Sequence, residues 1–366
     1  MTDNRHQTQG RIQPSIDARG TSPWIDIMNR FKDSLTGTTC HVDTNFSSNI
    51  DQLYNDMLLI APLTNTAIIT DEKWRYPDSD TGINHYEEML LLHPNLQNKD
   101  VIVVTHRYQN LKFGPRHWVV SYPIWFLINQ YYQHPDLSIK PGGLKYGFSS
   151  LNRRPALHRL LLGNQLYQNS LLDQVIFTQG DEDPGSFLPY VNCIPGFEQF
   201  KQLLPIQVLD LNNKEYAYTP YEINHHAYTD AYCNIVTETE SDRNVVNRGP
   251  VFNRGLPIMN HEIITEKSYK PFLSGQVPLF LACPGHMAYL KKLGFEVMED
   301  LVPVRYDQMH TLDKINVILD IVGRGPKWIE QFYFEHLSEI RHNHELITSG
   351  RIVDWLINNI QQFIRN

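Results

Sequence analysis

The 366-residue sequence contains no run of about 18 apolar residues, the length that a membrane-spanning helix needs. Its first stretch, MTDNRHQTQGRIQPSIDARG, has no apolar core either, so it does not have the pattern of a signal peptide. These two absences predict a protein without a membrane span that works in the cytoplasm, either of a bacterium or, if the chain is viral, of the host cell.

Cysteine pairs, basic charge and the common phosphate loops are also missing. The four cysteines, Cys40, Cys193, Cys233 and Cys283, are far apart, which argues against a zinc ribbon or a disulfide framework and favours a reducing compartment. The net charge of −8 argues against a general nucleic-acid coat but leaves room for a local basic groove. Neither G-x-x-x-x-G-K-[ST] nor a strand followed by G-x-G-x-x-G occurs, which disfavours an ATPase or a dehydrogenase.

What is present is an alternation of strand and helix patterns in two halves. The chain is long enough for two hydrophobic cores, and the stretch HPDLSIKPGGLKYGF, rich in proline and glycine, is typical of a linker. We therefore predict two similar α/β domains facing a cleft. The expected boundaries are a flexible tail at 1–22, a first domain at 23–140, a second at 141–322, and C-terminal helices at 323–366.

Apolar runs locate the expected elements. Strands are predicted at 67–69 and 101–105 in the first half, and at 145–152, 175–180, 233–240 and 277–282 in the second. Residues 118–132 are more apolar than a surface helix, so most of them are expected in a core. Helices are predicted at 156–174, 266–274, 312–322, 327–340 and 351–364.

The stretch from residue 261 to residue 285, HEIITEKSYKPFLSGQVPLFLACPG, is the most informative. Thr265 can cap the helix that follows, and Ser274-Gly275 can end it. Lys267 then lies in the first turn, where a positive charge opposes the helix dipole. The same lysine is useful if an anion binds there, since free backbone N–H groups and an ammonium together hold a phosphate.

Other polar groups follow the predicted strands of the second half. Arg153-Arg154 comes after one strand, Glu238 and Glu240 lie at the end of another, and Thr265-Glu266-Lys267 follows it along the chain. Guanidinium groups suit phosphate, and a carboxylate beside a lysine suits a ribose hydroxyl plus a diphosphate. Because the carboxyl ends of parallel strands meet at one edge of a sheet, these groups together predict a pocket for a nucleoside diphosphate.

These same residues carry a family resemblance. The segments NIVTETE and IITEKSYKPFLSGQVPLF, continued by LACPGHMAYLKKLGFEVMEDLVPVRYD, resemble the donor-binding half of GT-B glycosyltransferases, especially the fucosyltransferase-like group. FSSLNRRPALHR is similar to a segment of bacterial and phage-encoded sugar transferases. The resemblance covers about residues 145–321. The spacing between NIVTETE and ITEK is longer than fucosyltransferases usually show, so fucose is not implied.

The resemblance implies a GT-B-like fold of two Rossmann-like domains and roles for particular residues. Glu266 would bind the ribose, and Lys267, next to Thr265, would bind the diphosphate of the nucleotide sugar. Arg153 or Arg154 would neutralise the leaving phosphate, and Glu238 would lie near the donor sugar or hold the loop. The co-substrate would be a UDP- or GDP-sugar. The chemistry would need no cofactor and no metal, because cationic side chains and a helix N-terminus stabilise the departing diphosphate.

Metal binding is the weaker interpretation of three other patterns. Asp181–Asp183 lies between a glycine and a proline and not clearly at a strand end. His225-His226 and the pair His342 and His344 have no third ligand at a supporting spacing, so they are interpreted as polar groups of a surface or cleft.

An inverting reaction, which we expect, needs a base that deprotonates the acceptor hydroxyl. The first domain should supply it, and the position after a strand favours Asp71 and His106 without deciding between them. The remaining candidates are Glu72, Glu87 and Glu88.

The predicted function is transfer of a sugar from a nucleotide diphosphate to a hydroxyl acceptor, a glycan or a lipid-linked saccharide. Two alternatives stay open. The first is transfer to a hydroxymethylated base of phage DNA, which the acidic charge disfavours. The second is a non-catalytic protein that binds a nucleotide sugar or a glycan.

Overall fold

The computed structural model describes residues 39–43, 66–71, 100–105, 111–121, 137, 139–152, 156–180, 194–206, 226–238 and 264–365. The chain divides into two compact units. The first comprises Met1–Tyr131 together with Val353–Asn366, and the second comprises Tyr132–Ile352. Within the described residues, no helix combines the length and the apolar character that crossing a membrane requires.

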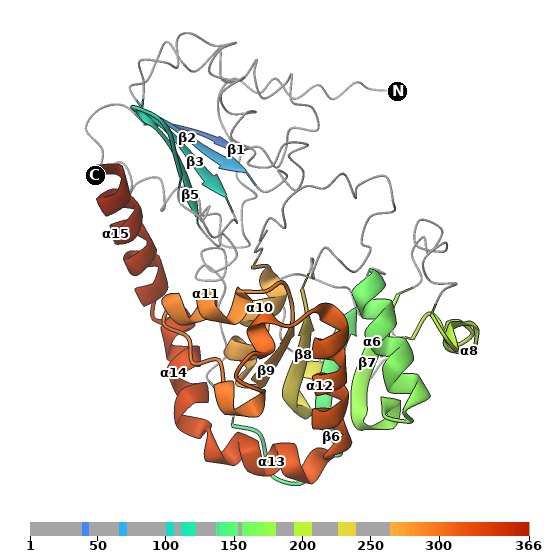
Figure 1. Cartoon of the computed structure of the whole chain (residues 1–366). Coiled ribbons are helices and arrows are strands. Elements are labelled where there is room, and N and C mark those ends of the chain that lie inside the picture. The colour runs from blue at the N-terminus through green and yellow to red at the C-terminus, as the bar shows by residue number, and fades with distance from the viewer. Residues whose placement is uncertain are drawn as a thin grey trace, which may run out of the picture. The chain divides into compact units, whose positions relative to one another are not determined.

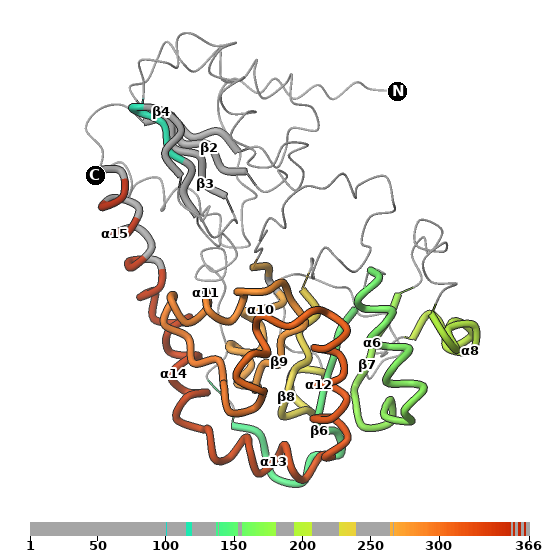
Figure 2. The backbone as a smooth tube through the Cα atoms, in the orientation of Figure 1, coloured from blue at the N-terminus to red at the C-terminus, as the bar shows by residue number. Residues whose placement is uncertain are grey.

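The first unit contains a five-stranded sheet of order β1-β2-β3-β5-β4 (Figures 1 and 2). The strands β1, β2, β3 and β5 run parallel, and β4 pairs antiparallel with β5 at the edge. The predicted strands at 67–69 and 101–105 are confirmed, and their runs of β-branched residues favour extended backbone. The strand bounds are Thr39–Asp43 (β1), Thr66–Asp71 (β2), Asp100–Thr105 (β3), Leu111–Gly114 (β4) and His117–Ser121 (β5).

Two features of this sheet differ from the sequence pattern. The start of the apolar run at 118–132, for which no strand was predicted, belongs to strand β5, which pairs in register with β3. Strands β1 and β4 were not predicted, since both are short and neither contains a run of apolar residues. A turn at Pro115-Arg116 joins β4 to β5, and the Arg116 guanidinium pairs with the Asp100 carboxylate at 2.7 Å.

The second unit is built on a four-stranded parallel sheet of order β7-β6-β8-β9 (Figure 1). All four strands predicted for the second half are confirmed. Their side chains are buried along nearly the whole length, as expected for a parallel sheet covered on both faces. The strands are Tyr146–Asn152 (β6), Val175–Gln179 (β7), Ala231–Thr237 (β8) and Val277–Leu281 (β9).

Helices cover both faces of this sheet. Gly147 and Tyr232 face α13, since a Cβ on Gly147 would lie 2.9 Å from the Cα of Pro326, and the Tyr232 and Tyr333 rings are 5.3 Å apart. Strand residues alternate between faces, and Phe177 on the other face packs against Gly163 of α6.

The described helices are α6 (Leu157–Gln168), α8 (Phe197–Lys201), α9 (His226–Thr229), α10 (Glu266–Ser274), α11 (His286–Lys292), α12 (Thr311–Gly323), α13 (Pro326–Glu335), α14 (Leu337–Thr348) and α15 (Arg351–Arg365), with 3-10 turns η3 (Leu172–Gln174), η6 (Glu299–Leu301) and η7 (Tyr306–Gln308).

The predicted helix at 327–340 is wrong as a single element, because the chain turns at His336 between α13 and α14. The imidazole Nδ1 of His336 lies 2.9 Å from the Phe332 carbonyl oxygen, and its Nε2 lies 2.7 Å from Oδ2 of Asp300. The ring also stacks on Phe332. These contacts hold the end of α13, and they cannot be seen in the local periodicity.

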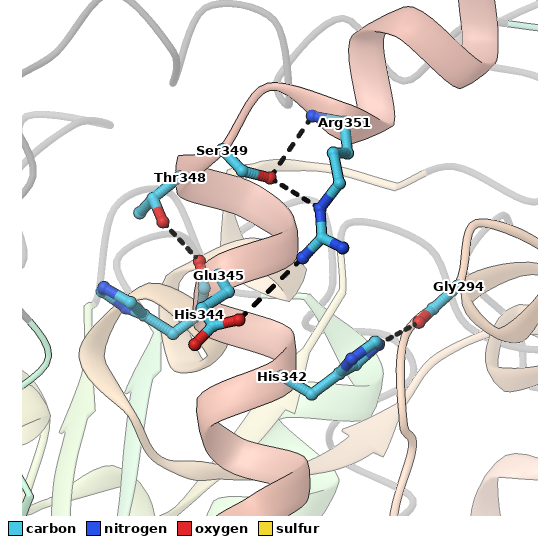
Figure 3. A network of polar contacts seen from close by, with 7 residues as sticks. All are labelled: Gly294, His342, His344, Glu345, Thr348, Ser349 and Arg351. Atoms are coloured by element: carbon cyan, nitrogen blue, oxygen red, sulfur yellow. Dashed lines mark hydrogen bonds and ion pairs between the residues drawn. The ribbon is translucent and has the colours of Figure 1, made fainter.

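A second break, at Ser349-Gly350, separates α14 from α15 (Figure 3). Gly350 has a φ of 78°, which glycine adopts without steric cost. Ser349 Oγ accepts from the backbone N–H of Arg351 at 3.4 Å and from its Nε at 3.1 Å. The Arg351 guanidinium reaches back to the Glu345 carboxylate at 4.0 Å. The predicted helix at 351–364 is confirmed as α15.

Candidate functional site

In the second unit the connections between strands reverse direction at β6. This reversal singles out the carboxyl ends of β6 and β8. The chain passes from β6 to β7 on one side and then to β8 on the other side of β6. In parallel sheets, ligands bind outside the carboxyl ends of the strands where the connections reverse in this way. A hydrogen bond from the Thr237 hydroxyl to the Asn152 side-chain oxygen joins the two strand ends. Arg153 and Arg154 come next in the sequence, outside the described residues.

The first turn of α6 is fastened to the end of β8. The Arg159 guanidinium donates to the backbone oxygens of Thr237 at 3.2 Å and of Glu238 at 3.0 Å. His158 Nε2 lies 2.8 Å from the same Glu238 oxygen. Both side chains are buried, and they hold the start of α6 against the end of β8.

Helix α10 has the two ends that the sequence predicts. Thr265 is its N-cap and accepts from the backbone N–H of Lys267, while Gly275 ends it in the left-handed conformation with a φ of 65°. Ser274 is the last helical residue, as the pattern Ser-Gly indicates. The helix starts beside the carboxyl end of β8, since the backbone N–H of its N-cap Thr265 donates to the Glu238 carboxylate.

The Glu238 carboxylate holds this helix start. It accepts from the Thr265 backbone N–H at 3.1 Å, from the Thr265 hydroxyl at 2.7 Å and from the Ser268 hydroxyl at 2.5 Å. Only 1% of the Glu238 surface is exposed. A buried carboxylate is tolerated when hydrogen bonds replace its water shell, and a helix N-terminus adds a favourable dipole.

His286 completes a buried chain of polar groups. Its Nε2 lies 2.9 Å from the Ser268 hydroxyl, and its ring packs against Phe280. Burial lowers its pKa to about 4, although the charges of Glu238 and Asp307 act in the opposite direction. The ring is therefore neutral near pH 7.

Ser268, His286 and Glu238 do not form a hydrolase triad. In such a triad the imidazole accepts the serine proton, and the carboxylate binds the other ring nitrogen. Here the carboxylate contacts the hydroxyl itself, and all three side chains are buried. The group is therefore suited to hold the start of α10 in place.

The Lys267 side chain is partly exposed at this helix start. Its Nζ donates to the Thr265 hydroxyl oxygen at 3.1 Å. An ammonium in the first turn of a helix suits a phosphate group of a ligand, because the positive end of the helix dipole adds to its charge.

The carboxyl end of β9 is closed by a second polar group. Lys314 Nζ donates to the backbone oxygens of Ala282 at 2.9 Å and Asp307 at 3.1 Å. The Asp307 carboxylate accepts from two backbone N–H groups in the first turn of α11, those of Met287 and Ala288. The sequence did not reveal α11, and Asp307 supplies its cap from 20 residues further along the chain.

The structure brings together three of the residues that the sequence singled out, Glu238, Thr265 and Lys267. Glu266 is the first residue of α10. Asp71 ends β2 in the first unit, in register with Thr105 of β3. The other predicted residues lie outside the described ranges: Arg153, Arg154, His106, Glu240, Glu72, Glu87, Glu88 and Asp181–Asp183.

Two of the histidines considered as metal ligands, His342 and His344, have backbone partners. His342 Nε2 lies 2.9 Å from the Gly294 oxygen (Figure 3), and His344 Nδ1 lies 2.9 Å from the Leu273 oxygen. His226 opens α9, and His225 is outside the described part. Among the described residues, no three His, Cys, Asp or Glu side chains are grouped so that they could hold a metal ion.

Sequence reasoning missed Arg159, Ser268 and His286. Ser268 lies three residues after Thr265, a spacing that places it on the first turn, but nothing local indicates a partner. Arg159 and His286 reach the site from other elements, so only the fold reveals them.

Comparison with protein-family models, with curated proteins and with solved structures found no match to this chain.

Proposed function

We propose that the chain is a glycosyltransferase that moves a sugar from a nucleotide diphosphate to a hydroxyl acceptor. The observation that carries the proposal is the start of α10. There the partly exposed Lys267 side chain lies in the first turn of the helix, at the carboxyl edge of a parallel sheet. This arrangement suits the diphosphate of a donor, and the resemblance of the same ITEK segment to GT-B glycosyltransferases points to a nucleotide sugar.

The remaining roles extend the proposal to residues that the sequence singled out. Glu266 would bind the ribose, and Arg153 or Arg154, which follow β6 at the switch point, would neutralise the leaving phosphate. The first unit would supply the acceptor side, with Asp71 or His106 as the base. Binding of the donor by one unit and of the acceptor by the other would correspond to a GT-B arrangement of two Rossmann-like domains.

A donor panel tests the proposal. The full chain is incubated with UDP- and GDP-sugars, with and without saccharide acceptors, and release of free nucleoside diphosphate is measured. We expect turnover with at least one donor and inhibition by the matching diphosphate. Absence of both turnover and inhibition across the panel would contradict a transferase, and tight donor binding without turnover would favour a non-catalytic binding protein.

A further inference from the structure

The Glu238 carboxylate and the Lys267 ammonium are connected through one hydroxyl group, that of Thr265. The single proton of this hydroxyl is donated to Glu238 at 2.7 Å. Its lone pairs accept from the Lys267 backbone N–H at 3.4 Å and from the Lys267 Nζ at 3.1 Å. The hydroxyl that Glu238 holds is therefore one of the contacts that position the ammonium.

Glu238 is held in turn from a second direction. The Ser268 hydroxyl donates to its Oε1 at 2.5 Å, so the imidazole of His286 must donate from Nε2 to the Ser268 oxygen, 2.9 Å away. A neutral ring with its proton on Nε2 meets this requirement. Since His286 begins α11, the chain of hydrogen bonds joins α10, α11 and the end of β8.

We propose that Glu238, Ser268 and His286 are positioning residues that act through Thr265 to hold the Lys267 ammonium where a diphosphate binds. Glu238 does not touch the donor, because its oxygens accept from Thr265 and Ser268 and its surface is 1% exposed. The inference rests on the proposed function. In it Glu238 does not contact the donor, and it affects donor binding only through Thr265 and Lys267.

Two simpler views predict different results. If the network only caps α10, then breaking it lowers stability but leaves the affinity of the folded protein for a diphosphate unchanged. If Glu238 acts only through its charge, then removing that charge strengthens anion binding, since like charges repel. Positioning predicts the opposite, a weaker affinity in protein that is still folded.

Calorimetric titration of the full chain with GDP and with UDP separates these views. Thr265→Val removes the hydroxyl at constant shape, Thr265→Ser keeps it, and Glu238→Gln removes the charge. We expect Thr265→Val and Glu238→Gln to weaken binding by at least about tenfold, and Thr265→Ser to stay within about twofold of wild type. In a Lys267→Met background, Thr265→Val should change the affinity by less than about twofold, because the group it positions is gone.

Ser274→Ala is the matched control for stability. Ser274 is a buried hydroxyl at the other end of α10, where it donates to the Pro271 oxygen at 3.1 Å. The Ser274→Ala substitution should lower the melting temperature without changing the affinity for the diphosphate. The melting temperature of each variant shows that the titrated protein is folded, and the Thr265 pair decides the question if Glu238→Gln does not fold.

The outcomes separate this inference from the proposed function. Wild-type protein that binds neither diphosphate overturns both. If Lys267→Met weakens binding while Thr265→Val binds like wild type, the positioning role alone is wrong. It is also wrong if Thr265→Val weakens binding equally with and without Lys267, or if Glu238→Gln binds as tightly as wild type or more tightly.

Discussion

His336 shows how one side chain can decide where a helix ends. Burial lowers its pKa, but the Phe332 carbonyl and the Asp300 carboxylate, both acceptors, together with the charge of Glu339, raise it above the ordinary value overall. Since both ring nitrogens face acceptors, the charged imidazolium with two N–H groups is the form that satisfies both. We therefore expect the junction of α13 and α14 to be sensitive to pH.

The stability that His336 contributes should fall as pH rises. A folded-state pKa above the unfolded value of 6.5 means that the contribution is fully present below pH 6.5 and is lost as pH rises through the folded pKa. The free energy of unfolding of wild type minus that of His336→Gln, measured by urea denaturation, should be larger below pH 6.5 than near pH 9. Asp300→Asn, which removes the carboxylate that raises the pKa of His336, should reduce this pH dependence. A His336 difference that is equal at all pH values would contradict this account.

At the scale of elements, the sequence predicted the strands and helices whose signals are local. The apolar runs of β6, β7, β8 and β9, and the caps Thr265 and Gly275 of α10, are visible in the periodicity and in the residue types. Elements whose limits depend on distant partners were not predicted. The break at His336 needs Asp300, and the start of α11 needs Asp307, so neither follows from neighbours in the chain.

Gly275, which ends α10, should not tolerate a larger residue. It has a φ of 65°, and an added Cβ would lie 2.4 Å from a methyl carbon of Leu137. Gly275→Ala should therefore lower the free energy of unfolding by about 1–3 kcal/mol. Gly323, at the end of α12, has no atom within 4 Å of such a Cβ. Gly323→Ala should instead be neutral or stabilise by up to about 1 kcal/mol. If urea denaturation showed that both substitutions change the free energy of unfolding equally, the need for glycine at position 275 would be contradicted.

At the scale of the whole molecule, the two units have different sheet orders. The parallel strands of the first unit follow one another as β1-β2-β3-β5, whereas the second unit reverses direction at β6. The second unit thus has the reversal of connections beside which parallel sheets bind ligands, and we propose that the donor binds there. Sequence patterns predicted two α/β halves. They could not show which polar groups meet, because Glu238, Ser268 and His286 meet only in the folded sheet.

The most direct test of the central claim is the affinity of the full chain for GDP and UDP with and without the Lys267 ammonium. A charged hydrogen bond to phosphate contributes about 1.5–3 kcal/mol, so Lys267→Ala should weaken binding of the preferred diphosphate by roughly 10- to 100-fold. Lys291→Ala removes an exposed lysine that pairs with Glu299 at 2.8 Å, and it should leave the affinity unchanged. Wild-type affinity in Lys267→Ala, or no binding of either diphosphate to the wild-type chain, would contradict a diphosphate site at the start of α10.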